Sequence, residues 1–248
     1  MSPLMQMRLK RFKENKLGFA CLILFALIFI LSLASELIAN DKPLLVKYDD
    51  SLYLPLFKSY PETTFGGLFE TEADYKDPVV QQLIDDQGWA LWPLIEYSYQ
   101  TPNLELAVPV PSAPTAQNWL GTDDQGRDVL ARILYGLRVS LLFGFALTFA
   151  SAILGVIVGA IQGYYGGWVD LLGQRILEVW GGLPTLFMVM ILVSMFTPNV
   201  YWLFLIMLCF GWTTLVGLVR AEFLKARNLD YVRAARGLGV SDRTIMFR

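Results

Sequence analysis

Long uncharged stretches separated by polar segments dominate this 248-residue chain and predict helices that cross a membrane. The first stretch, residues 17–35, contains no charged side chain. A helix over residues 17–39 would be about 34 Å long, enough to cross the hydrocarbon core of a bilayer. Because this stretch is longer than the apolar region of a signal peptide and has no obvious cleavage site after it, we expect it to stay in place as an anchor.

The second uncharged stretch, residues 139–169, predicts a span at about residues 141–161. Within it, small residues recur every four positions. Small residues at that spacing let the backbone of another helix approach closely, so we predict tight packing against a helix that the pattern does not identify. The alternative is that the glycines are tolerated here, as in many membrane helices. The residues concerned recur every four positions and form one stripe: Ser151, Gly155, Gly159 and Gly163.

The third uncharged stretch is too long for a single crossing. After Glu178 the next charged residue is Arg220, and one helix of that length would be roughly 60 Å, about twice the hydrocarbon thickness. We therefore predict a turn at residues 197–199, with spans near residues 183–196 and 200–219.

The shorter of these two spans is expected to begin before its uncharged part. A helix can extend back towards Asp170 through Arg175 and Glu178. Pro184 should then kink this helix, because proline removes a backbone hydrogen bond and its ring clashes with the preceding turn.

Basic residues flank the first and last predicted spans, so both chain ends are expected on the cytoplasmic side, which four crossings permit. Arg127, Arg132 and Arg138 lie on the side expected to be external, and we interpret them as interfacial. The flanking residues are Arg8, Lys10, Arg11, Lys13 and Lys16 before the first span, and Arg220, Lys225, Arg227, Arg233, Arg236, Arg243 and Arg248 after the last.

The segment 40–120 differs in kind from the spans, since it holds nine of the twelve prolines and many aromatic residues. It is too polar to cross a membrane and too aromatic for plain disorder, so a compact, loop-rich external domain is predicted. Within it, Asp77, Pro78 and Gly88 predict one short helix, with an aspartate cap, proline at the first position and glycine past the end.

Composition agrees with lipid as a solvent, since 55% of residues are hydrophobic and 17% are charged. The chain has no histidine, which excludes imidazole metal sites and histidine-based acid–base chemistry. Cys21 and Cys209 lie within apolar stretches, where packing is the better interpretation.

The charge-free spans offer no nucleophile–base pair or acid dyad, so an intramembrane enzyme is not expected. A phosphate-binding loop is also missing, so any ATP must bind to a partner.

Two polar segments carry further patterns. After residue 119 a glycine turn precedes a potential cap, Asp124 or Asp128, and an amphipathic helix that we expect to lie along the membrane surface before the second span. The tail 220–248 is basic, with small residues that would allow close docking onto another protein. The alternative for the tail is a solvated helix attracted to anionic lipid headgroups.

Three blocks of residues resemble the permeases of dipeptide and oligopeptide ABC importers. The first block resembles the signature before that family's second span and contains Gly121, Thr122, Asp123, Gly126, Arg127, Asp128, Val129, Leu130, Arg132, Tyr135 and Gly136. The second contains Gly163, Tyr164, Tyr165, Gly166, Gly167, Asp170, Arg175, Glu178 and Pro184. The third resembles the family's ATPase-coupling loop and contains Arg220, Ala221, Glu222, Asp230, Tyr231, Val232, Arg233, Ala234, Ala235 and Gly239.

Within this family the resemblance is to oligopeptide and microcin C permeases of the Yej type, because of residues 35–46 and the long external insertion. It implies that Asp230, Tyr231, Arg233, Ala234, Ala235 and Gly239 form the coupling loop, with Arg233 where the family usually has glutamate. We expect Ala234, Ala235 and Gly239 to be the contact residues because they are small. Candidate substrate-contacting residues are chosen only by polarity: Gln162, Asn199, Trp202 and Trp212. For Trp202 an aromatic anchor at the membrane interface is an equally good alternative.

The resemblance implies an all-α, polytopic membrane protein with the type I ABC importer permease fold, four transmembrane helices and a periplasmic insertion between the first two. Such a chain forms a path for oligopeptides or microcin C-like peptides across the inner membrane. The expected divisions are a cytoplasmic basic N-terminus (1–16), the first transmembrane helix (17–39), the periplasmic insertion (40–120), an interfacial amphipathic helix (121–138), transmembrane helices two to four (139–221) and an incomplete cytoplasmic coupling loop (222–248).

The partners that the resemblance implies are a second homologous permease, two cytoplasmic ATP-binding subunits, a periplasmic peptide-binding protein and membrane lipid, without nucleic acid. ATP would be used by the partners, and we expect no cofactor, metal or catalytic residue in this chain. The family's coupling loop continues beyond the position of Arg248 to further spans, so the chain resembles a permease shortened at its C-terminus. The alternative function is a truncated, non-transporting membrane adaptor or assembly protein.

Overall fold

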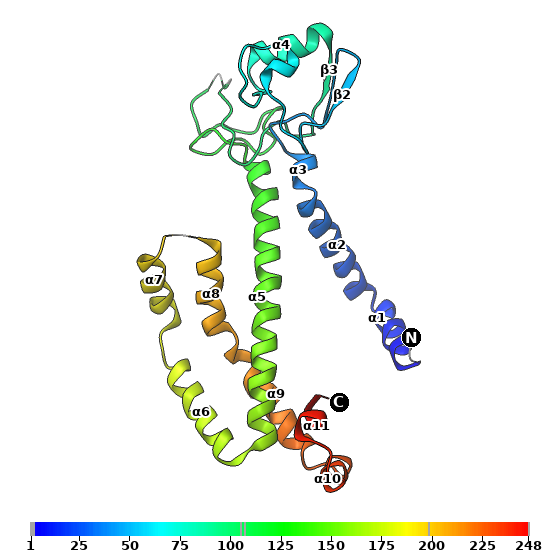
Figure 1. Ribbon diagram of the computed structural model, residues 1–248, viewed down its shortest axis with the longest axis vertical. Helices are drawn as coiled ribbons and strands as arrows, with labels where there is room; N and C mark the ends of the chain where they lie inside the picture. The colour runs from blue at the N-terminus through cyan, green and yellow to red at the C-terminus, as the bar shows by residue number, and fades with distance from the viewer. Residues whose placement is uncertain (1–2, 105, 107, 198, 248) are drawn as a thin grey trace. The chain divides into compact units, whose positions relative to one another are not determined.

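The computed structural model describes residues 3–104, 106, 108–197 and 199–247, and the chain divides into two compact units, Met1–Leu141 and Leu142–Arg248 (Figure 1). Among the described residues, three helices are long and apolar enough to cross a bilayer: Lys16–Leu33, Val129–Tyr165 and Val200–Ala226. A bent pair, Gly167–Gly181 and Thr185–Met195, can supply a fourth crossing. The fold is thus mostly helical, as predicted.

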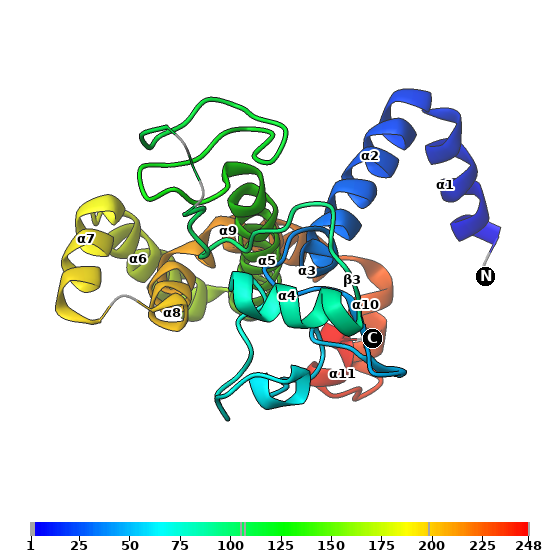
Figure 2. The same ribbon diagram turned by 90° about the horizontal axis from the view of Figure 1, so that it is seen from above.

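The first unit begins with helices α1 (Pro3–Glu14) and α2 (Lys16–Leu33), and Figure 2 shows the change of direction between them. Asn15 separates the two helices because its side-chain oxygen accepts a hydrogen bond from the backbone N–H of Gly18, 3.1 Å away, and so caps α2. α2 contains no buried charged residue, in agreement with a lipid-facing helix.

The single helix predicted over residues 17–39 is interrupted, since α2 ends at Leu33 and a four-residue helix α3 (Ser35–Ile38) follows. At the break, the hydroxyl of Ser32 donates to the carbonyl of Phe29, 2.7 Å away, and so competes for a carbonyl of the last turn. Beyond α3 the backbone pairs with Ile95, whose N–H donates to Ile38 O at 2.9 Å, and an extended pairing of this kind ends the helix.

A small antiparallel sheet, which the hydrophobic pattern did not predict, organises the polar segment. Its strands are β1 (Leu45–Tyr48), β2 (Ser51–Tyr53) and β3 (Gly88–Leu91), in the order β2-β1-β3. A two-residue turn with positive φ at Asp49 and Asp50 joins β1 to β2, the geometry that suits a tight hairpin.

The short helix predicted in this segment is confirmed as α4 (Pro78–Gln87). Asp77 caps it by accepting a hydrogen bond from the N–H of Val79 at 2.8 Å, and Pro78 occupies the first turn. Gly88 has a second role, because a Cβ there would overlap the carbonyl of Lys47 in β1. Glycine therefore allows β3 to pair with β1 directly after the helix.

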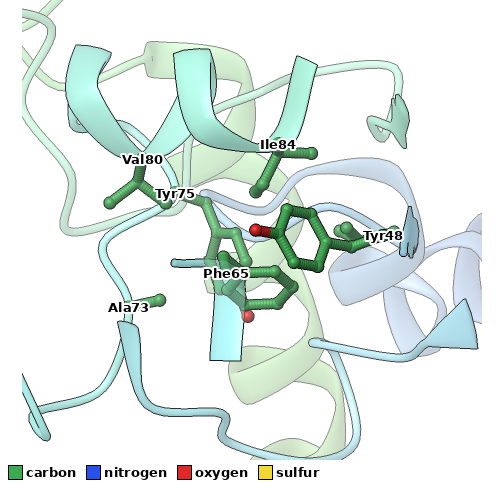
Figure 3. Close-up of a cluster of buried hydrophobic side chains, with 7 residues drawn as sticks. Tyr48, Phe65, Ala73, Tyr75, Val80 and Ile84 are labelled. Carbon is green, nitrogen blue, oxygen red and sulfur yellow. The ribbon is translucent and has the colours of Figure 1, made fainter. Parts of the chain in front are cut away.

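The aromatic residues of this segment form its core around the fully buried Phe65, which ends the 3-10 helix η1 (Glu62–Phe65). Tyr48 and Tyr75 meet Phe65 edge to face, with ring centroids 5.6 and 5.7 Å apart (Figure 3). Tyr53 adds a third edge contact at 5.4 Å. Each such pair adds to the stabilisation from burial, so a compact domain forms although its strands are short.

The boundary between the units falls within one continuous helix, α5 (Val129–Tyr165). The separate surface helix predicted over residues 121–138 is therefore wrong: residues 121–128 form a loop, and Asp128 caps α5 by accepting from the N–H of Ala131 at 2.7 Å. No proline lies between Val129 and Tyr165, so nothing stops the helix at the polar boundary. At 37 residues α5 is about 55 Å long, more than a bilayer core requires.

The second unit continues with α6 (Gly167–Gly181) and α7 (Thr185–Met195), which are bent by 73° relative to each other. The kink predicted at Pro184 is thus a complete break, and Pro184 stands at the N-terminal boundary of α7. Gly182 precedes the break and ends α6, so two residues that disfavour helix interiors act together.

Four helices complete the second unit: α8 (Val200–Gly211), α9 (Thr213–Ala226), α10 (Asp230–Gly237) and α11 (Asp242–Phe247). Only Trp212 separates α8 from α9, and together they make up the candidate span Val200–Ala226. Asn199 caps α8 through the N–H of Tyr201, 3.0 Å away. Pro198, the centre of the predicted turn, lies outside the described residues. Trp202 stacks on Phe196 across this connection, with ring centroids 4.4 Å apart, so α7 and α8 run side by side.

We predict that Phe65→Ala lowers the stability of the domain around the sheet by about 3–5 kcal/mol, because it leaves a cavity where several aromatic rings meet. Hydrogen exchange of residues 45–91 in the detergent-solubilised chain measures the effect, and protection there should fall sharply. Phe57→Ala is the matched control, since the side chain of Phe57 is 77% exposed. Equal loss of protection in both variants would contradict this description of the core.

Candidate functional site

The residues expected to form a coupling loop lie on an exposed helix. Asp230, Tyr231, Arg233, Ala234 and Ala235 all belong to α10, and Gly239 lies between α10 and α11 at φ +80°. We call α10 and α11 together, residues 230–247, the coupling segment.

An apolar stripe runs along the outer side of α10. Tyr231, Ala234 and Leu238 are spaced three and four residues apart, which places them on one helix face. Tyr231 is 69% and Leu238 is 83% exposed, and Ala234 between them is also exposed. Val232 points the other way and is buried, while Ala235 is half-buried at the edge of the stripe. A small residue flanked by two large exposed ones forms a shallow surface that another protein can cover.

Three side chains attach the coupling segment to the end of α5. The hydroxyl of Tyr164 donates a hydrogen bond to Oδ1 of Asp242 at 2.5 Å. The guanidinium of Arg236 lies over the ring of Tyr164, 4.9 Å from its centroid, and its Nε is 4.0 Å from the same carboxylate oxygen. Sequence reasoning noted Tyr164 only as part of a motif and did not predict its partner, because 78 residues separate Tyr164 from Asp242.

The first turn of α6 is tied to the middle of α9 by charge. Arg220 makes a two-pronged ion pair with Asp170, with Nη2 2.7 Å from Oδ2 and Nε bonded to Oδ1. Arg227 covers the turn before α6 so closely that a Cβ at Gly166 would overlap its guanidinium. Gly166 also has φ +65°, a conformation that glycine adopts without strain.

The glycine stripe of α5 lies against α9, the helix that the sequence could not identify. A Cβ at Gly155 would lie 2.7 Å from the carbonyl oxygen of Trp212. At Gly159 it would lie 2.7 Å from that of Val216, and at Gly163 2.5 Å from that of Arg220. The three carbonyls, like the three glycines, are four residues apart, so the two backbones follow each other for more than two turns.

The loop 121–128 before α5 is organised around Asp123. Its carboxylate accepts hydrogen bonds from the side chain of Arg127 at 2.9 Å, from Arg132, and from the backbone N–H groups of Gln125 and Arg127 at 2.9 Å each. Burial alone would raise the pKa of Asp123, but these hydrogen bonds and the charge of Arg127 outweigh it and lower the pKa to about 2. Asp123 is therefore an anion that holds two arginines in place.

A second carboxylate, Asp128, lies at the end of a buried polar chain. Asn103 donates to Asn118 at 2.9 Å, and Asn118 donates to Asp128 at 2.8 Å. All three are at least nine-tenths buried. Asn103 and Asn118 were missed from the sequence, since single asparagines in a loop carry no periodic signal. Of the two caps predicted, Asp128 is the one that caps α5.

The remaining signature residues shape the same loop. Thr122 is buried, and its hydroxyl accepts from the N–H of Ser112 at 3.0 Å. Gly121 and Gly126 have φ +76° and +77°, which favour glycine. The signature before the second span thus builds a connection between the sheet domain and α5, and its residues are engaged with one another.

The arginines on the expected external side each have an acidic neighbour. Arg127 and Arg132 both pair with Asp123, and Arg138 pairs with Glu36 at 3.0 Å. Three arginines thus share two carboxylates within the first unit.

The four side chains proposed for substrate contact are not gathered in one place. Asn199 and Trp202 help to line a mostly apolar cavity of about 310 Å³ between α7 and α8. Gln162 is buried and accepts a hydrogen bond from Gln174 at 2.8 Å. The indole of Trp212 donates to the carbonyl of Cys209 at 2.9 Å. Two of the four thus take part in packing within the second unit.

The described residues contain no group of three or more histidine, cysteine, aspartate or glutamate side chains that could hold a metal ion. The polar clusters described above are arginine–carboxylate pairs and a chain of amides, whose hydrogen-bonding groups pair with one another. Such an arrangement can position helices and present a surface to another protein.

Comparison with known protein families gives two matches. Residues 137–248 match the family described as the binding-protein-dependent transport system inner membrane component. Residues 2–56 match the N-terminal TM domain of oligopeptide transport permease C.

Similar curated proteins agree with these matches. The inner membrane ABC transporter permease protein YejE of Escherichia coli K12 is 55% identical over 248 residues, which is all of this chain and 73% of that protein. The peptidoglycan transport system permease protein YejE of Agrobacterium fabrum is 46% identical over 271 residues, covering all of this chain and 71% of that protein. The oligopeptide transport system permease protein OppC of Haemophilus influenzae is 40% identical over 139 residues, 55% of this chain and 45% of that protein.

We predict that Gly159→Ala destabilises the packing of α5 on α9 by about 1–3 kcal/mol, because the added methyl group forces the two backbones apart. Reversible unfolding of the chain in mixed micelles measures the change. Gly144→Ala in the same helix is the control, since a Cβ there meets no atom within 4 Å. Alanine's better helix propensity should leave that variant unchanged or more stable by up to about 1 kcal/mol. Equal effects at both positions would show that the stripe has no packing role.

We predict that Asp123→Asn loosens the loop before α5 by about 1–3 kcal/mol at neutral pH, because two arginines lose their anion. The folded-state pKa of Asp123 lies below its ordinary value, so this stabilisation is complete above about pH 4 and is lost as the pH falls towards about 2. Thermal unfolding in detergent between pH 7 and pH 2 measures both effects. Asp124→Asn removes the same charge from an exposed neighbour and should change neither the melting temperature nor its pH profile.

Proposed function

This chain belongs to the family of inner membrane permeases of binding-protein-dependent ABC importers, and from that membership we propose that its coupling segment receives the movement of a partner ATPase. The protein is a non-catalytic, multi-pass component of the inner membrane. As a member of this family it works with an ATP-binding partner and a substrate-binding protein. Which residues meet which partner is the subject of the proposal.

The exposed stripe of α10 is the observation that carries the proposal. Tyr231 and Leu238 project large apolar surfaces from a helix whose opposite side is held by Val232 and Arg236. A monomeric protein in water gains nothing by exposing these side chains, but a partner that covers them removes their apolar area from solvent. Ala234 between them lets that partner approach the helix backbone, as small residues do in close helix packing.

Coupling then follows from a difference in free energy between two states. ATP favours the closed arrangement of the ATP-binding subunits, and α10 moves with the surface on which it sits. The helices attached to α10 change position in turn and open the path to the other side of the membrane. In this scheme two ATP-binding subunits drive two related permeases, of which this chain is one.

For the substrate we propose peptides, such as oligopeptides or microcin C-like peptides. The support is that similar proteins are named for oligopeptide and dipeptide transport, and one for peptidoglycan transport. A periplasmic binding protein would deliver the peptide on the side of the sheet domain, with both chain ends in the cytoplasm. The basic residues at each end support that orientation.

We predict that Ala234→Trp in the assembled importer separates ATP hydrolysis from uptake. The indole prevents the stripe from docking closely on the ATPase. Uptake in proteoliposomes should therefore fall by about tenfold or more, while ATP hydrolysis continues. A tenfold fall is within the range of a typical coupling free energy. Ala234→Ser, which keeps the small volume, is the control and should transport normally. A normal ratio of uptake to hydrolysis in Ala234→Trp would contradict the proposal.

A further inference from the structure

Tyr164 occupies an unusual position, because it is a buried polar residue at the very end of a membrane-spanning helix. It is the second-last residue of α5 and is only 4% exposed. Its hydroxyl points out of the helix and donates to Asp242, the first residue of α11. The interaction is a hydrogen bond to a carboxylate, a stronger type than one between two neutral groups.

Arg236 strengthens this contact from the other helix of the coupling segment. Its guanidinium stacks over the ring of Tyr164 and faces the carboxylate of Asp242. The side chains of Arg236 and Asp242 are 53% and 47% exposed, and an ion pair so exposed contributes little alone. Tyr164 is the member of the three that is buried, so it fixes where the other two meet.

Beyond Tyr164 the chain leads directly into the helices of the membrane domain. Two residues later Gly166 begins the turn into α6, over which Arg227 of the α9 boundary lies. Four residues further Asp170 of α6 holds Arg220 of α9. A displacement of α10 therefore has two routes into the unit: through the backbone into α9, and through Tyr164 into the junction of α5 with α6.

We propose that Tyr164 is a positioning residue for energy coupling, whose hydroxyl, through Asp242, transmits the movement of the coupling segment to the junction of α5 and α6. This inference rests on the proposed function, since it assumes that a partner ATPase moves α10. Without this bond the segment would still be attached through α9 but could turn about that connection. Part of the movement imposed on α10 would then be lost before it reached α5.

The test is Tyr164→Phe in the assembled importer, which removes only the hydroxyl and keeps the ring under Arg236. Uptake per ATP hydrolysed should fall by about fivefold to tenfold, at the lower end of the range of coupling between sites in proteins. Tyr165→Phe is the matched control: its side chain is 51% exposed, and among the described residues its hydroxyl has no hydrogen-bond partner. That variant should keep the normal ratio. An unchanged ratio in Tyr164→Phe would overturn the proposal.

A second variant addresses the same bond from its other side. Asp242→Asn keeps an acceptor oxygen but removes the charge, so it should lower the ratio in the same direction. Because both substitutions act through one interaction, the double variant should be no worse than the more damaged single variant. Additive losses would show that Tyr164 and Asp242 act independently. If Tyr164→Phe fails to assemble with its partners, uptake per ATP hydrolysed in Asp242→Asn decides the proposal: a lower ratio supports it and an unchanged ratio overturns it.

A cross-linking measurement separates this inference from the proposed function. Ala234→Cys should form a cross-link to the partner ATPase both with Tyr164 and with Phe at that position. Cross-linking together with a normal ratio in Tyr164→Phe would reject the role of Tyr164 and leave the proposed function standing. Absence of any cross-link with Tyr164 present would reject the proposed function itself.

Discussion

The close approach of α5 and α9 is the constraint on which the second unit depends. Gly155, Gly159 and Gly163 bring the two backbones so near that a methyl group would not fit between them. Since lipid gives apolar helices little reason to associate, contact of this kind is a principal source of helix attraction in a bilayer. It also fixes the end of α9 beside the end of α5. The coupling segment, which continues from α9, consequently emerges next to Tyr164.

In the first unit, the signature residues before α5 shape a loop instead of a contact between helices. Thr122 is hydrogen-bonded to Ser112, Asp123 to Arg127, and Asp128 to Asn118, which in turn accepts from Asn103. These bonds hold the loop that leads into α5. Asp123 and Asp128 are each engaged with cations or N–H groups. The chain thus uses these polar residues to position helices.

Local signals in the sequence predicted local structure well. Asp77, Pro78 and Gly88 defined α4 because a cap, a first-turn proline and a terminal glycine act within a few residues. Pro184 marked the break between α6 and α7 for the same reason. The strands β1, β2 and β3 escaped prediction because each has only three or four residues, too few to show an alternating pattern. The start of α5 at Val129 was misjudged because a change in polarity was taken for a change in structure.

Contacts between distant residues were beyond reach of the sequence. The stripe of α5 predicted close packing, but many apolar helices could have supplied the facing carbonyls. The pairing of Tyr164 with Asp242 and the chain from Asn103 to Asp128 depend on how the helices and loops fold together. The apolar stripe of α10 was visible only as small residues, since the exposure of Tyr231 and Leu238 requires the orientation of the helix.

The central claim is that the outer face of α10 is covered by a partner ATPase. Hydrogen–deuterium exchange of residues 230–238, compared between the permease alone and the assembled importer, tests it most directly. We expect the amides of α10 to exchange more slowly in the assembly, while those of α4 in the first unit remain unchanged. Equal exchange of α10 in both samples would contradict the account.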